Sequence, residues 1–344
     1  MPDPYPANAA ERDRWILTRR GTRSVVDPAQ PYGFFAEEER AASGEVVSVN
    51  TVLLTNRECP WRCLMCDLWK HTLTEPVPPG AIPAQIDYAL KRLPPARQIK
   101  LYNSGSFFDR QAIPVEDHPA IAERVRGSER VIVESHPALI GDDVRRFRDL
   151  LSEGAISSRS RRREEAHDGC RLQIADCGLE VALGLETACP EVLERLNKRL
   201  TLDQFRRAAE FLQKNEMALR VFVLVRPPFL DEAAALHWAC RSIDFAFDCG
   251  ATVVALIPTR GGNGALDALA QQGEFSPPSL RTVESSLDYG IGQRRGRVFV
   301  DLWDIARLAT CRHCSTARVT RLRQLNLAQD SPPPVACAEC SKVG

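Results

Sequence analysis

The sequence predicts an α/β protein built on an open barrel of the TIM type, a partial (β/α)6 sheet with helices outside. Short apolar runs alternate with segments of helical periodicity between residues 46 and 262, which is typical of parallel sheets. Polar residues recur where these runs end, at the edge that carries the active sites of β/α barrels. We expect an N-terminal arm at 1–45, the barrel core at 46–262 and, at 263–344, an extension with a four-cysteine metal-binding module.

Composition narrows the class of protein. The 344 residues are 44% hydrophobic, so the chain can bury a large core. Lys plus Arg and Asp plus Glu are 45 each, so no overall charge attracts nucleic acid or an anionic membrane. The sequence holds no apolar run of the roughly 20 residues that a membrane span needs, and its N-terminus lacks the layout of a secretory signal. We expect a cytoplasmic protein without a membrane partner.

The expected elements follow in chain order. Apolar runs predict strands at 46–54, 99–102, 130–134, 179–185, 219–225 and 252–257. Helical spacing of apolar residues predicts helices at 82–93, 119–125, 142–152, 191–196, 202–214 and 233–248. The charge-dense residues 157–171 predict an exposed loop. Beyond the barrel core, we expect a helix at 278–289 and a strand at 298–302.

Cysteine usage points to metal sites. Seven of the twelve cysteines are clustered, and clustered cysteines in a reducing compartment are typical of metal ligands rather than of disulfides. The other five are expected to be small buried hydrophobic residues. These scattered residues are Cys170, Cys177, Cys189, Cys240 and Cys249.

Three of the clustered cysteines follow the first strand. Cys59, Cys63 and Cys66 are spaced C-x3-C-x2-C. A four-iron cube normally takes four cysteines, so three would leave one iron open for chemistry. The alternative is a structural or zinc site.

The other four clustered cysteines lie in the C-terminal extension. Cys311, Cys314, Cys337 and Cys340 are spaced C-x2-C-x22-C-x2-C. This spacing fits a closed four-thiolate zinc site, and it also fits an auxiliary iron–sulfur cluster or no metal at all. His313 is expected to be a bystander.

The cysteine triplet after a first strand, followed by β/α repeats, resembles the radical SAM superfamily. The resemblance implies a [4Fe–4S] cluster on the triplet and S-adenosylmethionine (SAM) bound to its open iron. It implies that Ser104, Gly105 and Ser106 meet the methionine amino group, and that Glu134 and Ser135 meet the ribose. The residues that it places near the adenosine are Gly184, Glu186 and Pro258.

Further stretches resemble one branch of this superfamily. Residues 102–109 read Tyr-Asn-Ser-Gly-Ser-Phe-Phe-Asp, and residues 133–135, 183–187 and 226–229 fit the same branch. It contains the radical SAM subunit of archaeosine synthase and relatives of the Elongator catalytic subunit. The resemblance implies a deazaguanine-type nucleoside in tRNA as substrate, a tRNA-modifying partner protein, and an electron donor such as flavodoxin or ferredoxin.

Three other functions fit the same sequence. A radical SAM enzyme with a non-RNA substrate would keep the triplet, and a cluster carrier would transfer its cluster without turning SAM over. An inactive, zinc-dependent nucleic-acid-binding or adaptor protein would hold zinc without iron. Arginines that could contact phosphate occur in two groups, but no catalytic acid or base stands out. The two groups are Arg159, Arg161, Arg162 and Arg163, and Arg312, Arg318, Arg321 and Arg323.

Overall fold

One eight-stranded sheet organises the protein. The computed structural model describes residues 3–163 and 178–340. The strands pair in chain order from β1 to β8; β1 is antiparallel to β2, and every later pair is parallel. The α/β partial-barrel fold is thereby confirmed. The strands are β1 Gly33–Arg40, β2 Val46–Leu53, β3 Gln98–Tyr102, β4 Arg130–Ser135, β5 Gly178–Glu186, β6 Ala218–Val225, β7 Val253–Pro258 and β8 Arg297–Val300.

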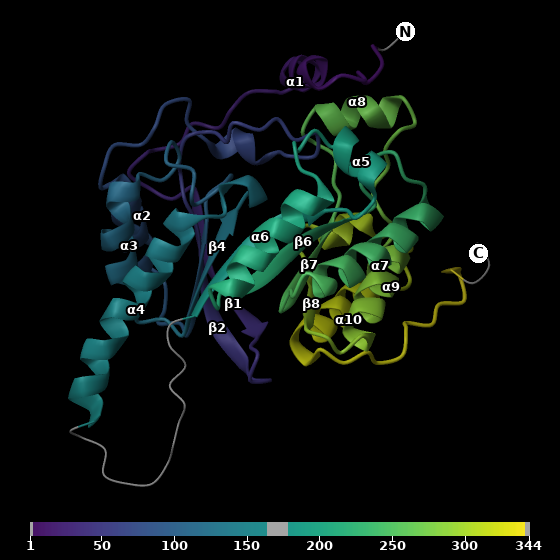
Figure 1. The fold of residues 1–344 in the computed structure, drawn as a ribbon. Coiled ribbons are helices and arrows are strands. Elements are labelled where there is room, and N and C mark those ends of the chain that lie inside the picture. Colours follow the sequence, from purple (N-terminus) through teal and green to yellow (C-terminus); the bar gives the residue numbers. More distant parts are fainter. Residues whose placement is uncertain (1–2, 164–177, 341–344) are drawn as a thin grey trace.

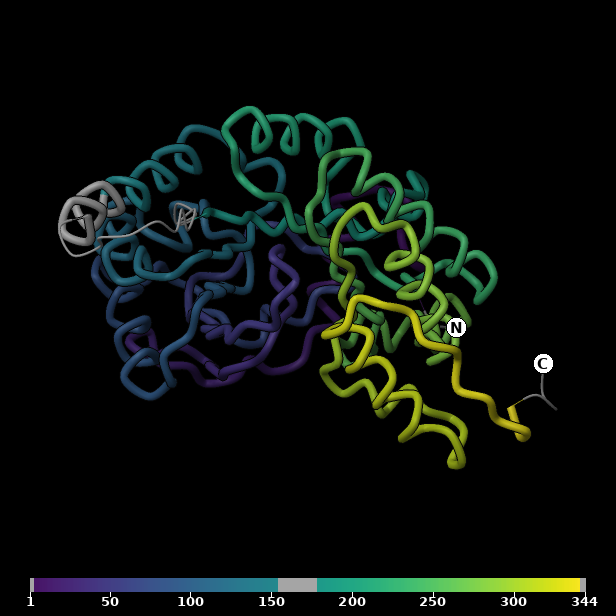
Figure 2. Tube along the Cα trace, turned by 90° about the horizontal axis from the view of Figure 1, so that it is seen from below, coloured from purple at the N-terminus to yellow at the C-terminus, as the bar shows by residue number. Residues whose placement is uncertain are grey.

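Helices surround the outside of the curled sheet. Seen from below, they follow one another around it largely in chain order (Figure 2). The α-helices are α1 Ala9–Leu17, α2 Ala81–Leu90, α3 His118–Val125, α4 Asp142–Arg163, α5 Pro190–Arg195, α6 Leu202–Lys214, α7 Glu232–Asp248, α8 Ala265–Gln271, α9 Leu280–Gly292 and α10 Ser315–Ala328. Short 3-10 helices are η1 Leu68–His71, η2 Val115–Asp117, η3 Pro137–Leu139 and η4 Ile305–Leu308. No helix of the described residues is long and apolar enough to cross a membrane.

The sheet extends past the predicted core at both ends. β1 lies within the expected arm, and β8, the strand expected at 298–302, joins the sheet beside β7. β1 was missed because Glu37, Glu38 and Glu39 look like an exposed charged run, whereas Glu39 is buried and both Glu37 and Glu39 pair with cations. The division at residues 45 and 262 stays a prediction.

The predicted loop at 157–171 was wrong in its first part. Helix α4 continues through this region to Arg163, and the remainder lies outside the described residues. Side chains in α4 are described only up to Glu153, so the basic cluster at Arg159–Arg163 has no described contacts.

The core lies between the sheet and the helices. Strand residues such as Val52, Leu101, Val133 and Val223 are fully buried together with the inner faces of the helices. This burial is the main favourable contribution to folding, because apolar surface removed from water gains roughly 25 cal/mol per Å².

A buried ionic network fills the end of the barrel where the parallel strands begin. Arg220 on β6 binds Glu39 on β1 at 2.5 Å and Glu180 on β5 at 2.6 Å. Lys100 on β3 reaches the second oxygen of Glu39 at 2.6 Å. These four side chains, which we call the barrel-floor network, link the antiparallel edge strand to strands across the barrel.

Candidate active site

The cysteine triplet lies in the loop between β2 and η1, at the carboxyl end of the sheet. Cys59, Cys63 and Cys66 are each partly buried, and the N–H of Cys66 donates to the carbonyl of Cys63 at 3.2 Å. This is the rim where the sequence places the functional residues.

Hydrogen bonds from distant segments fix the backbone of the loop. The N–H of Leu64 donates to the Leu196 carbonyl at 2.9 Å, and Leu64 itself is fully buried. The Asn263 amide donates to the carbonyls of Leu64 at 2.8 Å and Cys66 at 3.3 Å. Asn197 donates to the carbonyl of Arg62 at 2.8 Å. The three thiols are therefore carried by a loop whose backbone is fixed by hydrogen bonds.

The N-terminal arm covers this loop. Trp15 and Ile16 of α1 form one apolar cluster with Leu64 and with Leu266 and Leu269 of α8. Figure 1 shows α1 and α8 together above the upper edge of the sheet. The arm is thus part of the wall around the cysteines.

Burial raises the pKa of all three thiols to about 12, and each cysteine also feels the charge of another. A thiol with a raised pKa stays protonated at neutral pH. Thiolates form here when a metal displaces the protons. This chemistry suits a metal-bound centre and does not suit a free nucleophile.

The spacing of the triplet fits a cluster better than a single ion. Among the described residues, the group whose ligand atoms are close enough to share one ion consists of other cysteines and includes none of these three. In a cube each cysteine binds a different iron, so its sulfurs lie farther apart than sulfurs on one ion. The residues present therefore fit a [4Fe–4S] cluster.

The segment Ser104–Ser106 packs directly on the cysteine loop. A Cβ added to Gly105 would lie 3.1 Å from the Cβ of Cys59, so a glycine allows this close approach. Ser104 has a left-handed backbone, with φ of 54°. Next to it, both polar atoms of the Asn103 side chain are buried without a partner in the described structure. Unpartnered buried polar atoms beside the cysteines mark a place where a polar ligand can bind.

Glu134 and Ser135 at the end of β4 contact this segment. Glu134 accepts the N–H of Asn103 at 2.6 Å and hydrogen bonds from the backbone of Ser104 and Gly105. Burial raises the pKa of Glu134 to about 6. The hydroxyl of Ser135 lies 2.8 Å from that of Ser106. Both side chains therefore support the glycine-containing turn.

Gly184 and Glu186 at the end of β5 lie against a buried cation. Lys198 Nζ is 2.7 Å from Glu186 Oε1, and both residues are at least nine-tenths buried. A Cβ on Gly184 would come within 2.5 Å of both charged groups, so no other residue fits without moving the pair. Lys198 also acts electrostatically on Cys59 and Cys63.

Lys198, Trp61 and His136 belong to this site and were missed from the sequence. The indole of Trp61 stacks on the His136 ring with centroids 3.8 Å apart. His136 Nε2 lies 3.0 Å from the carbonyl of Lys198, and Nδ1 accepts the N–H of Ala138. No spacing rule marks these residues; Trp61 inside the triplet was the one available signal.

Pro258 ends β7 on the same rim. It is buried and pairs with Val225 of β6. Its neighbour Ile257 and Met65 of the cysteine loop pack against one apolar cluster. The predicted SAM contacts at the ends of β3, β4 and β5 thus gather around the triplet, and Pro258 stands at the edge of the group.

The second cysteine cluster also forms. The four sulfurs of Cys311, Cys314, Cys337 and Cys340 all lie within 4.8 Å of one another. Two nearby candidates for phosphate contacts are occupied instead, because Arg318 and Arg321 are buried and pair with Glu284 and Asp288.

Comparison with known proteins gives one relative that spans most of the chain. No protein-family model matches the sequence. The chain is 25% identical over 315 residues to archaeosine synthase subunit beta of Methanosarcina acetivorans, covering 84% of this chain and 81% of the relative. The predicted resemblance to this subunit is thereby confirmed.

The solved structures that match this chain are less similar to it in sequence. Elp3 of Methanocaldococcus infernus is 14% identical, with a TM-score of 0.46, and the match covers 71% of this chain and 58% of that one. Coproporphyrinogen III oxidase of Escherichia coli, described as a radical SAM enzyme, is 10% identical with a TM-score of 0.43 and coverage of 70% and 52%.

Proposed function

We infer that this chain, which resembles archaeosine synthase subunit beta, is a radical SAM enzyme that acts on a deazaguanine-type nucleoside in tRNA. The observation that carries the enzymatic part is the loop with Cys59, Cys63 and Cys66 at the carboxyl rim of a β/α barrel. Gly105 packs on this loop at Cys59, and the nearby side-chain amide of Asn103 is buried without a partner in the described structure. The relative's name carries the substrate part.

A [4Fe–4S] cluster on the three cysteines would supply the electron that splits SAM into methionine and a 5′-deoxyadenosyl radical. The described residues bind and orient. We assign Ser104, Gly105 and Ser106 to the methionine end of SAM. Glu134 and Ser135, which hold this turn in place, would also meet the ribose.

We assign the other end of the site to the adenosine part of SAM. Gly184 and Glu186 would lie beside it, with Lys198 balancing the charge of Glu186. Pro258 would line its edge. The arm carrying Trp15 excludes water from the cysteine side of the site, which protects a radical from side reactions.

The test of radical chemistry is direct. Protein reconstituted with iron and sulfide under anaerobic conditions, then given dithionite and SAM, should form 5′-deoxyadenosine. The variant with Cys59→Ala, Cys63→Ala and Cys66→Ala is the matched control and should form none. Protein that holds zinc but no iron or sulfide would instead favour the adaptor function, and cluster transfer without SAM cleavage would favour a carrier.

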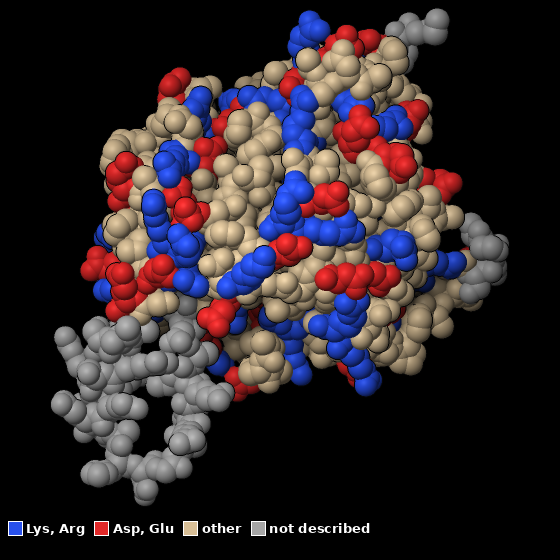
Figure 3. Space-filling view, viewed as in Figure 1, with Lys and Arg blue, Asp and Glu red and all other residues tan. Residues whose placement is uncertain are grey.

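The tRNA substrate needs a separate test. Net charge is zero, and the face in Figure 3 intersperses both signs of charge, so electrostatics alone do not support RNA binding. The modified nucleosides of tRNA from cells with and without the gene should differ at one deazaguanine-type nucleoside. An unchanged profile would reject the tRNA substrate and leave the radical chemistry standing.

Partners follow from the same comparison. The relative is named a subunit, so we propose that this chain works with a second tRNA-modifying protein in the cytoplasm. We also propose that a flavodoxin or ferredoxin replaces dithionite in the cell. Co-purification from the native host, followed by activity with and without the added partner, tests the assembly.

A further inference from the structure

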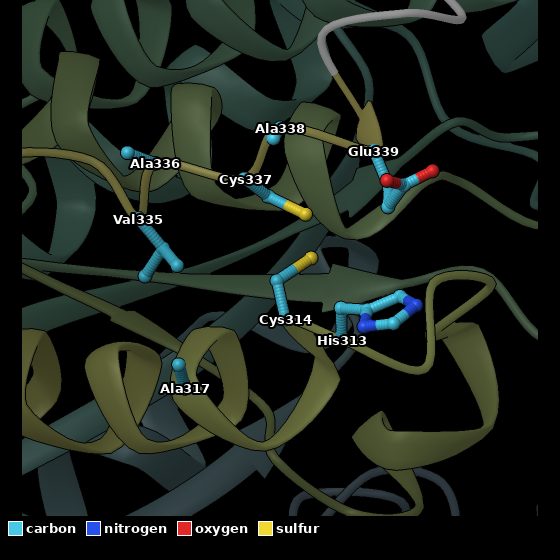
Figure 4. Close-up of a pocket in the computed structure, with 8 residues that line it drawn as sticks. All are labelled: His313, Cys314, Ala317, Val335, Ala336, Cys337, Ala338 and Glu339. Atoms are coloured by element: carbon cyan, nitrogen blue, oxygen red, sulfur yellow. The ribbon is translucent and has the colours of Figure 1, made fainter.

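The four C-terminal cysteines approach one another more closely than the ligands of a cube could. Cys311 Sγ lies 3.8 Å from Cys337 Sγ, and Cys314 Sγ lies 3.6 Å from Cys340 Sγ. Figure 4 shows Cys314 and Cys337 on separate segments with their sulfurs directed toward each other, and His313 beside them. All four sulfurs lie within 4.8 Å of one another.

These distances match one tetrahedral ion. Metal–sulfur bonds of about 2.3 Å hold four sulfurs about 3.8 Å apart. An auxiliary cube would spread them over four separate irons. We propose that this site takes a single Zn²⁺ ion and serves as the anchor of helix α10, which closes the free edge of the sheet.

The surrounding charge suits a tetrathiolate ion. Four thiolates and one divalent cation leave a net charge of −2, which needs a cationic neighbour. Arg318 Nε donates to Cys314 Sγ at 3.2 Å, and the same guanidinium pairs with Glu284 of α9. Arg318 thus joins the metal site to the helix packed beside α10.

The other end of α10 closes the edge of the sheet. β8 is the last strand of the sheet, and no other strand of the described residues pairs with its outer backbone groups. Gln329 accepts the N–H of Val298 and donates to its carbonyl, both at 2.7 Å. Asn326 does the same with Val300, both at 2.9 Å. Two side-chain amides thus replace the missing strand, which protects an edge that would otherwise pair with another chain.

The proposed metal site and the side-chain amides of Asn326 and Gln329, which we call the amide clamp, lie at opposite ends of helix α10. Cys314 directly precedes α10, and the clamp lies in its last turn and at its end. Near the clamp, Arg40 at the end of β1 donates to the Leu327 carbonyl at 3.5 Å, so α10 also touches the opposite edge strand. Loss of the ion should therefore let α10 detach from the sheet and expose the edge of β8 to solvent. The structure around Cys59, Cys63 and Cys66 should stay unchanged.

Metal analysis tests the ion. The variant with Cys59→Ala, Cys63→Ala and Cys66→Ala removes the first site, so metal that remains belongs to the second. We expect one zinc per chain and no sulfide, and Co²⁺ in its place should give the visible absorption of a tetrahedral thiolate site. Iron with sulfide in this variant, or no bound metal, would overturn the proposal. Formation of 5′-deoxyadenosine by the unaltered protein does not enter this test, so the two proposals fail separately.

Hydrogen exchange tests the anchor. Cys337→Ser should release zinc and speed amide exchange at Val298 and Val300 at least tenfold, whereas Cys337→His, which keeps a zinc ligand, should restore both. Cys240→Ser, on α7, is the control and should change neither. Gln329→Leu should speed exchange at Val298 while zinc is retained. Zinc loss with unchanged exchange at β8 would reject the anchoring role.

Discussion

Lys198 is a buried cation whose main partner is Glu186. Lys198→Met leaves the Glu186 carboxylate buried without a counter-charge, and we expect it to lower the free energy of unfolding by about 3–5 kcal/mol. The double variant Lys198→Met/Glu186→Met removes both charges and should lose less than the single variant. Chemical denaturation of the metal-free protein measures both.

A matched control exists for this pair. Arg206 and Asp203 on α6 form an exposed pair, with side chains 51% and 75% exposed. Arg206→Met should change stability little, because exposed pairs are screened by water. Equal losses for Lys198→Met and Arg206→Met would show that burial of the first pair has no energetic consequence.

His136 is expected to stay neutral over the physiological range. Burial, and then the charge of Lys198, lower its pKa to about 3. The unfolded chain binds this proton near pH 6.5, so between pH 6.5 and 3 the unfolded state holds more protons and stability falls as pH falls.

Nuclear magnetic resonance of the histidine rings measures this directly. The His136 signals should not shift between pH 8 and about pH 4. A His136 titration near neutral pH would contradict the assigned burial.

The candidate metal ligands could be predicted from the sequence. The residues that surround them and hold their loop in place could not. Seven cysteines stood out because thiolate ligands need fixed short spacings. Lys198 lies in a connection between two helices and reaches the site through the fold alone. Asn263 and Asn197 hold the cysteine loop across long stretches of chain, so no local pattern marks them.

At the scale of elements, helix α1 belongs to the predicted N-terminal arm, yet it packs into an apolar cluster beside the cysteine loop. Trp15 is 3% exposed and packs between the cysteine loop and α8. Trp15→Ala should cost about 3–5 kcal/mol in unfolding free energy, because a large buried side chain is lost. The variant should also lose iron from the proposed cluster faster in air, since α1 then covers the cysteine loop less completely.

Trp303 is the control for this prediction. Its side chain is 68% exposed, so Trp303→Ala should leave stability and iron retention nearly unchanged. Denaturation curves and iron content over time in air measure both effects. A stable Trp15→Ala variant that keeps its iron as well as Trp303→Ala does would contradict the covering role of α1.

The central strands of the sheet were predictable, and so was β8 at one edge, but the other edge strand, β1, was not. β4 and β6 could be predicted because parallel strands buried on both faces are rich in Val, Ile and Leu, although Arg220 interrupts the apolar residues of β6. β1 carries three consecutive glutamates, Glu37 to Glu39, that look exposed in the sequence. The partners of Glu39, Lys100 and Arg220, lie far along the chain. Charge that is satisfied only in three dimensions cannot be recognised as buried from the sequence.

At the scale of the whole molecule, the two edges of the sheet are joined without strand pairing. The barrel-floor network ties β1 to β3, β5 and β6, and Arg297 of β8 donates to the carbonyl of Arg40 at 2.8 Å. Helix α10 adds its clamp at the β8 edge. The open barrel is therefore closed at its floor by polar contacts, and these contacts leave the rim, where we propose that SAM binds, untouched.

Arg220 is the central residue of the barrel-floor network, so its substitution tests the network most directly. The residue is 3% exposed and binds both Glu39 and Glu180. Arg220→Met leaves two buried carboxylates short of a partner and should lower the free energy of unfolding by about 3–5 kcal/mol. Arg97 is the matched control, because it also joins two glutamates, but on the surface, and Arg97→Met should change stability little.

The loss of stability in the Arg220→Met variant should also depend on pH. Burial opposes ionisation of Glu39, but Arg220 and Lys100 outweigh it and hold the pKa of Glu39 well below its usual range. A carboxyl with a lowered folded pKa stabilises the protein above its unfolded pKa of about 4.3, and this stabilisation disappears as pH falls through the folded value. The gap between the unaltered protein and Arg220→Met should therefore be full at pH 7 and narrow below about pH 4. Denaturation at a series of pH values measures it, and a gap that stays constant down to pH 3 would mean that Arg220 stabilises the barrel by packing and not by its charge.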